Sequence, residues 1–216
     1  MLKVAAFDFD GTLADSVDFC LAVFDKVFAK YMGENAPSRE DIYQNFGMNE
    51  PGVLRYFMGR TVPEAEAEFI RLHRELHPQM CPELFAGIRE LLLFLKEKHV
   101  ELVLLTGRGC DTAAISLEYL GIKEFFSLCY FGAPEKNDKT GQLLHLCQTR
   151  QLKKEELVYV GDALSDAQAS ARAGIKCFSA AWAKSARIAE LEKTNPGLVF
   201  KSVRDLQEHF AAELAG

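Results

Sequence analysis

Short apolar runs recur along the chain, and longer segments whose apolar residues follow a helical period lie between them. The runs are too short for helices and are bounded by Gly, Asp or Thr, which predicts buried strands. The predicted strands are Val4 to Phe9, Glu101 to Leu105, Ser127 to Phe131, Leu157 to Val160 and Ile175 to Ala180, with a candidate sixth at Leu198 to Phe200. The helices predicted next to them are Glu83 to Lys98, Asp111 to Leu120, Lys139 to Arg150, Leu164 to Ala173 and Arg204 to Leu214. Repeated strand–helix units predict an α/β fold with a parallel sheet covered on both faces.

Residues 15–82 depart from this alternation, because they contain no convincing strand. Their helical segments lie near Val17 to Tyr31, Arg39 to Phe46 and Glu64 to His77, separated by breaks that include Pro51-Gly52. This is too much chain for one crossover between neighbouring strands. We therefore predict that residues 15–82 form an inserted helical cap on a core made of residues 1–14 and 83–216.

The composition is ordinary for a water-soluble globular protein, with 49% hydrophobic and 26% charged residues. The formal net charge of −6 disfavours a general nucleic-acid binder, which needs a basic face. No apolar run has the ~18 residues of a spanning helix, and the start lacks the pattern of a signal peptide. The six cysteines are scattered without a C-x-x-C pair, which is typical of reduced thiols. We therefore expect a cytoplasmic monomer or homodimer with no nucleic-acid or membrane partner.

Polar residues follow three of the predicted strands. Ligands of open α/β sheets bind beyond the carboxyl ends of the strands, so these residues form the candidate site. They are Asp8-Phe9-Asp10-Gly11-Thr12 after the first strand, Thr106-Gly107-Arg108 after the second, and Gly161-Asp162 with Asp166 after the fourth, and Lys139 opens the helix before the fourth strand.

The spacing of the acids indicates a cation. Asp8 and Asp10 point to the same side of an extended chain, while Phe9 points into the core. Carboxylates that point together repel one another unless a cation or a proton lies between them. With Asp162 and Asp166 nearby, the four acids predict a site for a hard cation with oxygen ligands, and Mg²⁺ fits best.

The remaining residues at the strand ends suit a phosphate ester. Thr106 offers a hydroxyl and Lys139 a positive charge for phosphoryl oxygens. Gly11 and Gly107 allow tight turns and close approach of the backbone, where exposed N–H groups can bind an anion. The sequence therefore predicts a phosphate site beside the cation site.

At these positions the chain resembles the haloacid dehalogenase superfamily, in its phosphatase branch. It is most similar to members of the phosphoglycolate phosphatase and β-phosphoglucomutase types that carry a helical cap. The resemblance extends over essentially the whole chain, and the motifs stand in the family's order: Asp8-Phe9-Asp10-Gly11-Thr12, Thr106, Lys139, and Gly161-Asp162 with Asp166. It implies a Rossmann-like parallel-sheet core and Mg²⁺-dependent hydrolysis of a small organic phosphomonoester.

The resemblance also implies a role for each residue. Asp8 would be the nucleophile that forms an aspartyl-phosphate, and Asp10 would be the general acid and then the general base. Thr106 and Lys139 would stabilise the transferred phosphoryl group. The groups that would hold Mg²⁺ are Asp8, the Asp10 backbone carbonyl and Asp162, with Asp166 close by.

Several assignments stay open. Lys136, three residues before Lys139, is an alternative for the motif lysine. Arg108 stands where relatives often carry other residues, and it could reach the substrate or the cap. Further candidates for substrate contact are Glu50, in the loop Gly47-Met48-Asn49-Glu50, and the turn residues Gly11, Thr12 and Gly107. A phosphosugar mutase, an inorganic pyrophosphatase and a non-catalytic phosphate-binding module remain alternative functions.

Two pairs of polar residues have structural interpretations. Asp15 and Ser16 are expected to cap the first helix of the insertion. His73 and His77 stand four residues apart on one predicted helix, a spacing that can bind metal. No Glu follows His73 as in the H-E-x-x-H motif, so we predict that both histidines lie on a solvated helix surface.

Overall fold

The computed structural model of the chain describes residues 1–135 and 138–215. Its centre is a parallel sheet of six strands in the order β3-β2-β1-β4-β5-β6. The strands are β1 (Val4–Phe7), β2 (Glu101–Leu105), β3 (Leu128–Tyr130), β4 (Leu157–Gly161), β5 (Lys176–Ala180) and β6 (Val199–Phe200). All six predicted strands are confirmed, with small differences at their ends.

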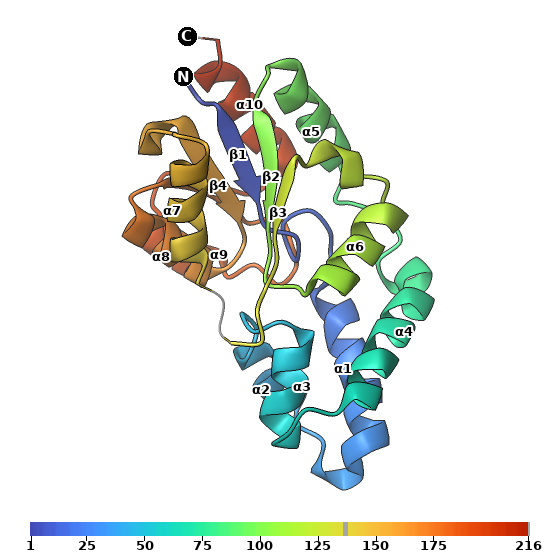
Figure 1. Cartoon of the computed structure of the whole chain (residues 1–216). Helices are drawn as coiled ribbons and strands as arrows, with labels where there is room; N and C mark the ends of the chain where they lie inside the picture. The colour runs from blue at the N-terminus through green and yellow to red at the C-terminus, as the bar shows by residue number, and fades with distance from the viewer. Residues whose placement is uncertain (136–137, 216) are drawn as a thin grey trace.

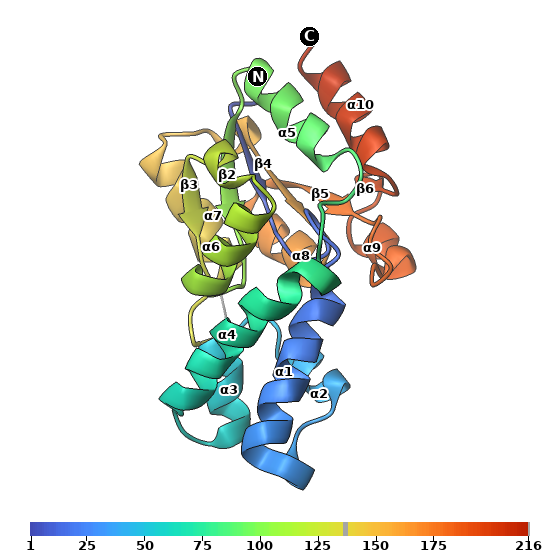
Figure 2. The ribbon, with the colours of Figure 1, turned by 90° about the vertical axis from the view of Figure 1, so that its right-hand side faces the viewer.

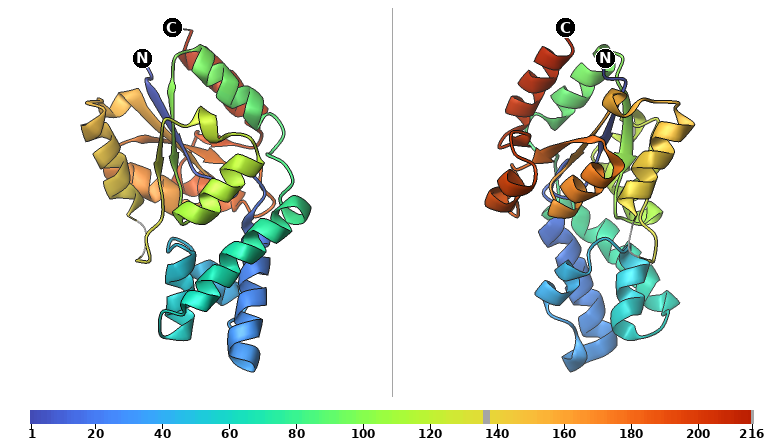
Figure 3. Two further views of the ribbon diagram at one scale, coloured as in Figure 1. Left: turned by 45° about the vertical axis from the view of Figure 1, so that its right-hand side comes forward. Right: turned by 90° about the vertical axis from the view of Figure 1, so that its left-hand side faces the viewer.

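Helices cover both faces of the sheet, as the alternation of strands and helices predicts (Figure 1, Figure 3). They are α5 (Ile88–Glu97), α6 (Cys110–Tyr119), α7 (Lys139–Thr149), α8 (Leu164–Ala173), α9 (Ile188–Thr194) and α10 (Val203–Glu213). Three short 3₁₀ turns lie at Gly33–Asn35, Lys123–Phe125 and Lys154–Glu156. The predicted α/β class with a parallel sheet is therefore confirmed.

Alternate residues of each strand face two different cores, which is the consequence of the period of two in a strand. Ala5 and Phe7 of β1 belong to the core on the side of α5 and α10. Val4 and Ala6 belong to the core beneath α7 and α8, where the fully buried ring of Tyr159 also lies. Burial on both faces explains why the strands read as continuous apolar runs.

Four helices are inserted between β1 and β2 and lie beyond the carboxyl ends of the strands (Figure 1, Figure 2). They are α1 (Val17–Met32), α2 (Arg39–Gln44), α3 (Glu50–Met58) and α4 (Pro63–Met80), called the helical insertion below. The aromatic rings of Phe24, Phe28 and Phe69 lie in its interior, with Phe24 and Phe69 centroids 4.5 Å apart.

Helix α3 differs from the sequence prediction, in which Pro51-Gly52 is a break between helices. Pro51 occupies the first turn, where its missing N–H costs nothing, and the Asn49 side chain accepts from the Gly52 N–H at 3.0 Å. A Cβ on Gly52 would overlap the Pro134 carbonyl, so glycine permits α3 to pack on the loop after β3. The short helix α9 was also missed, since it spans only two turns. In the residues that the structure describes, no helix combines the length and apolar character needed to cross a bilayer.

Candidate active site

Three neighbouring strands bring the candidate residues to one edge of the sheet. Phe7 of β1 pairs with Leu104 of β2 and with Val160 of β4, so the residues that follow these strands meet. Asp8, Thr106 and Asp162 are those residues. The sheet register therefore assembles a site from segments that lie far apart in the sequence.

Three carboxylates form the acidic cluster, defined as Asp8, Asp162 and Asp166. An oxygen from each lies within 4.8 Å of the other two. Asp166 is fully buried at the start of α8, where its second oxygen accepts from the Ala163 N–H at 3.1 Å. The dipole of α8 favours an anion at this position. The predicted clustering of these three acids is therefore present in the structure.

Lys139 enters the acidic cluster from the first turn of α7. Its Nζ lies 3.0 Å from Asp8 Oδ2, 2.6 Å from Asp166 Oδ1 and 2.9 Å from the Tyr159 hydroxyl. Burial alone would lower the pKa of Lys139, but Asp166 and Asp8 outweigh it and raise that pKa well above its usual value. The lysine is therefore a permanent cation. Its alternative, Lys136, lies outside the described residues.

One lysine does not neutralise three carboxylates. Burial, together with the charges of Asp166 and Asp10, raises the pKa of Asp8 to about 7 although Lys139 opposes the shift. Burial and the charges of Asp8 and Asp166 raise the pKa of Asp162 well above its usual range. Such shifts mark a surplus of negative charge that a bound cation would relieve.

The donor set fits a hard divalent cation. All three groups of the acidic cluster are carboxylates, which Mg²⁺ and Ca²⁺ prefer, and neither sulfur nor imidazole nitrogen is among them. Gly11, at φ +70°, leaves room for the ligands, because a Cβ there would overlap the Asp162 carboxylate. Its own N–H donates to the Ala14 carbonyl at 3.0 Å, so it closes a turn and is not the exposed anion donor expected from the sequence.

Asp10 points away from the acidic cluster and toward Arg108. Arg108 Nη2 lies 2.6 Å from Asp10 Oδ1, and Nε lies 2.9 Å from Oδ2. Ser16 donates its hydroxyl to Asp10 Oδ1 at 2.6 Å. Burial would raise the pKa of Asp10, but the charge and hydrogen bonds of Arg108 outweigh burial and lower that pKa. Asp10 is therefore held as a carboxylate in this conformation.

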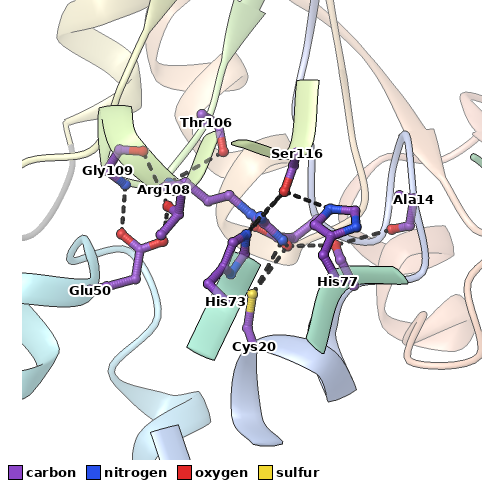
Figure 4. A network of polar contacts seen from close by, with 12 residues as sticks. Ala14, Cys20, Glu50, His73, His77, Thr106, Arg108, Gly109 and Ser116 are labelled. Carbon is purple, nitrogen blue, oxygen red and sulfur yellow. Dashed lines mark hydrogen bonds and ion pairs between the residues drawn. The ribbon is translucent and has the colours of Figure 1, made fainter. Parts of the chain in front are cut away.

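Arg108 has acceptors for all five of its N–H groups. Besides Asp10, Nη1 donates to Ser116 Oγ at 2.8 Å and to His73 Nε2 at 3.3 Å, and Nη2 lies 3.2 Å from Cys20 Sγ. Its guanidinium carbon also lies 4.5 Å from the centroid of the Phe9 ring. We call this set the Arg108 network; its members are Arg108, Asp10, Ser16, Cys20, His73, His77 and Ser116. Figure 4 labels Arg108, Cys20, Ser116 and the two histidines. It joins α1 and α4 of the helical insertion to the end of β2 and to α6.

The prediction for His73 and His77 is wrong, because they are 0% and 1% exposed. Both rings approach Ser116 Oγ, His73 Nε2 at 3.1 Å and His77 Nε2 at 2.9 Å. Burial and the charge of Arg108 lower the pKa of His73 to about 2 and that of His77 to about 4. Both rings are therefore neutral at pH 7. Their period, in register with buried Phe69 on α4, was the sequence signal that indicated burial.

Ser16 also differs from its expected role. It stands at the start of α1, but its side chain caps no N–H of that helix and bonds to Asp10. The α2 helix shows the usual arrangement instead, with a capping box between Ser38 and Asp41. Asp15 is exposed, in the connection between β1 and α1.

A cavity of about 280 Å³ lies between the strand ends and the helical insertion. Of the predicted site residues, those that line it are Asp8, Asp10, Glu50, Gly107, Arg108, Lys139 and Asp162. Thr12, Thr106 and Asp166 are fully buried behind this wall. The Thr106 hydroxyl accepts from the Arg108 backbone N–H at 3.3 Å, so it shapes the loop after β2. Thr12 contributes its carbonyl to the Trp182 indole N–H at 3.1 Å.

Glu50 links the helical insertion to α6. Its carboxylate accepts from the Gly109 N–H at 2.7 Å (Figure 4) and from the Thr112 hydroxyl. Burial raises the pKa of Glu50 despite these two hydrogen bonds. Beside it, the Asn49 N–H donates to the Ala133 carbonyl at 2.9 Å. These contacts hold α3 against the strand ends and close the cavity on that side.

Several residues that shape this site were not predicted from the sequence. They are Cys20, Ser116, Tyr159 and Thr112 on helices or strands, and Tyr43, Ser185 and Arg187 around the cavity. Only the period of α6 could have indicated that Ser116 is buried. The others carry no local signal, because their roles depend on which helices pack together.

Comparisons with known proteins identify the family and the fold. A family model described as haloacid dehalogenase-like hydrolase matches residues 5–180. A phosphoglycolate phosphatase of Chromobacterium violaceum is 30% identical over 187 residues, which cover 80% of this chain and 82% of the relative. A Clostridium perfringens protein, PpaX, named provisionally as a pyrophosphatase, is 30% identical over 180 residues and covers 82% of each chain. The solved structure of a hydrolase from Pseudomonas syringae has a TM-score of 0.77 at 23% identity, and the match covers 97% of this chain and 98% of that one.

Proposed function

The chain belongs to the haloacid dehalogenase-like hydrolase family, and we propose that it hydrolyses a small organic phosphomonoester through a phosphorylated Asp8 with Mg²⁺ bound. The observation that carries the proposal is the acidic cluster around Lys139, at the carboxyl ends of β1 and β4. Relatives named as phosphoglycolate phosphatases support the phosphate ester as the substrate class.

Asp8 is the nucleophile in this proposal. Its carboxylate lines the cavity, and Lys139 Nζ at 3.0 Å holds one oxygen in place. That oxygen attacks phosphorus while the ester oxygen leaves, which gives an acyl phosphate on Asp8. Lys139 remains beside the phosphoryl oxygens and neutralises their charge. Water then displaces the phosphate and restores the carboxylate.

Asp8, the Asp10 carbonyl and Asp162 are the proposed ligands of Mg²⁺, and Asp166 supports them through Lys139. Bound Mg²⁺ would supply positive charge that neutralises the acidic cluster and the transferred phosphate. The side chain of Asp10 is not needed for this purpose, which agrees with its position on Arg108.

Asp10 is proposed as the general acid and base, but in the position seen here it must move before it can play either role. A carboxylate held by Arg108 has no proton to donate. To act on the leaving oxygen, Asp10 must exchange its Arg108 contacts for the substrate, and it takes up a proton where it no longer faces the guanidinium. The Arg108 network therefore describes a resting arrangement of Asp10.

The helical insertion is proposed to be a cap, with the boundary near residue 82. Glu50, Asn49 and the Arg108 network fasten it over the site. A closed cap excludes water from the phosphoryl group and places side chains against the leaving group.

The test is hydrolysis of 4-nitrophenyl phosphate by the full chain. We expect activity that needs Mg²⁺, disappears with EDTA and returns when the metal is restored. Asp8→Asn should lower kcat at least about a thousandfold, because it removes the nucleophile. Asp15→Asn, at an exposed acid outside the cavity, is the matched control and should keep its activity.

Activity that survives Asp8→Asn would contradict the assignment of Asp8 as the nucleophile. Activity in EDTA would contradict the proposed need for a metal. Mass spectrometry of a rapidly quenched reaction should locate a phosphoryl group on the peptide that contains Asp8. Inorganic pyrophosphate belongs in the same assay because one relative is named for that substrate. A strong preference for it would replace the phosphomonoester in this proposal.

A further inference from the structure

The wall that the helical insertion presents to the cavity is mainly apolar. Its apolar side chains are Val17, Phe24, Phe46, Met48 and Val53, and Cys20, Tyr43 and Glu50 line the same side. They line the same cavity as Asp8 and come from the helical insertion, which lies beyond the carboxyl ends of the strands. An apolar wall favours apolar parts of a ligand, and it penalises a charged group that finds no partner.

Two of the three cations that line the cavity are largely buried and already engaged. Lys139 is bound to Asp8 and Asp166 at the position of the phosphate. Arg108 uses all five of its N–H groups within the protein. Arg187 lies at the rim with a 60% exposed side chain and an ion pair to Glu190 at 2.6 Å. In this resting arrangement of Asp10, none of the described residues offers a free buried cation to an anionic leaving group.

Glu50 adds a second obstacle to such an anion. Its buried carboxylate faces the same cavity, and both of its oxygens are already occupied by Gly109 and Thr112. A substrate carboxylate would meet this acid without a cation between them. Repulsion of like charges is strong where water is excluded.

We infer that the leaving group of the natural substrate is uncharged and mainly apolar, and that the apolar wall around Met48 determines this specificity. The inference rests on the proposed phosphatase function and names its substrate class. It separates this chain from relatives named for phosphoglycolate, whose leaving group carries a carboxylate.

The experiment compares two esters that differ in one charge, phenyl phosphate and 4-carboxyphenyl phosphate. Their phenols are similar leaving groups, so a difference in kcat/KM reports contacts with the cavity wall. With the full chain and Mg²⁺, we expect kcat/KM for phenyl phosphate to be at least about 10-fold higher. 2-Phosphoglycolate should be a poorer substrate than phenyl phosphate as well.

A variant makes the test a gain of function. Met48→Lys places a cation in the apolar wall and should raise kcat/KM for 4-carboxyphenyl phosphate about 10-fold. Met48→Gln, a neutral change at the same position, should not. Tyr56→Lys adds the same charge at a residue of α3 that is 61% exposed, and it should leave the preference unchanged. Thermal unfolding of each variant shows whether it is folded.

Equal or better turnover of 4-carboxyphenyl phosphate by the native chain would overturn the inference. If Arg108→Gln then abolished that preference, Arg108 would be the receptor for the carboxylate. Absence of Mg²⁺-dependent hydrolysis of every ester would contradict the proposed function instead. If Met48→Lys fails to fold, the two esters on the native chain still decide the matter.

Discussion

Asp8 and Asp10 stand two residues apart at the end of one strand, yet the protein shifts their acidities in opposite directions. In the acidic cluster, burial and two further carboxylates raise the pKa of Asp8 to about 7. In the Arg108 network, a guanidinium lowers the pKa of Asp10 although burial opposes it. The side chains are chemically identical, so their different partners determine the direction of each pKa shift. Asp8 lies in a surplus of negative charge, whereas Asp10 is already paired with a cation.

The two regions also differ in origin. The members of the acidic cluster directly follow β1 and β4 or lie in the first turn of α8, so none of them belongs to the helical insertion. The Arg108 network needs Cys20 from α1 and the histidines of α4 as well as Ser116 of α6. The first region can therefore form without the helical insertion, whereas the second depends on its position.

The largest effect should come from removing the cation of the Arg108 network. Arg108→Gln leaves Asp10 partly buried without its ion pair, and it removes the donors to Ser116 and His73. We expect the free energy of unfolding to fall by about 3 kcal/mol, as for other broken buried ion pairs. Urea unfolding at pH 7 measures the change.

Arg150→Gln is the matched control. Arg150 makes a similar two-point contact with Glu101, but the side chains are 37% and 29% exposed. Solvent screens this pair, so its loss should cost about 0.5 kcal/mol. Equal losses in the two variants would show that burial does not distinguish the pairs.

The two regions also differ in how much of each could be predicted from the sequence. The acidic cluster was predictable, because each of its residues directly follows a recognisable strand or begins a helix, and parallel strands end at one edge. Asp10 was also predicted, but its partner was not, since the sequence indicates only that Arg108 could reach the substrate or the cap. Its actual contacts come from three other helices, and no local pattern records which helices pack together.

The histidines show the same limit in another form. A four-residue spacing on a helix fits both a solvated face and a buried one. The choice depends on whether α6 offers a polar partner, which Ser116 does. Likewise, α3 was hidden because Pro51 and Gly52 read as breaks, while Asn49 and the loop at Pro134 make them suitable for a helix start.

A second prediction concerns acid stability. The unfolded chain protonates His73 near pH 6.5, whereas the native pKa is about 2, so the native state loses stability as pH falls below 6.5. Between pH 7 and pH 5 this histidine should account for a loss of about 2 kcal/mol. His73→Gln should reduce the loss by that amount in urea unfolding at the two pH values.

His209→Gln, at an exposed side chain beside Glu213, is the control and should leave the acid dependence nearly unchanged. Carboxylates contribute equally to both variants, so they cancel in the comparison. An acid dependence in His73→Gln that matches the native chain would mean that this ring is protonated in the folded state, against the contacts of the Arg108 network.

The last prediction tests the acidic cluster without its metal. Asp8 has a native pKa of about 7 and an unfolded value near 3.8, so its burial costs stability progressively as pH rises between these values. In EDTA at pH 8, Asp8→Asn should therefore be more stable than the native chain by at least about 1 kcal/mol, and the full pKa shift corresponds to about 4 kcal/mol. Lys139 keeps Asp166 and Tyr159 as partners in this variant. The gain should fade toward pH 4 and reverse when saturating Mg²⁺ stabilises only the native chain.

Asp25→Asn, at a surface acid paired with Arg39, should show neither trend. If Asp8→Asn is less stable than the native chain at pH 8 in EDTA, then Lys139 already satisfies Asp8, and the surplus charge that calls for a metal is not there.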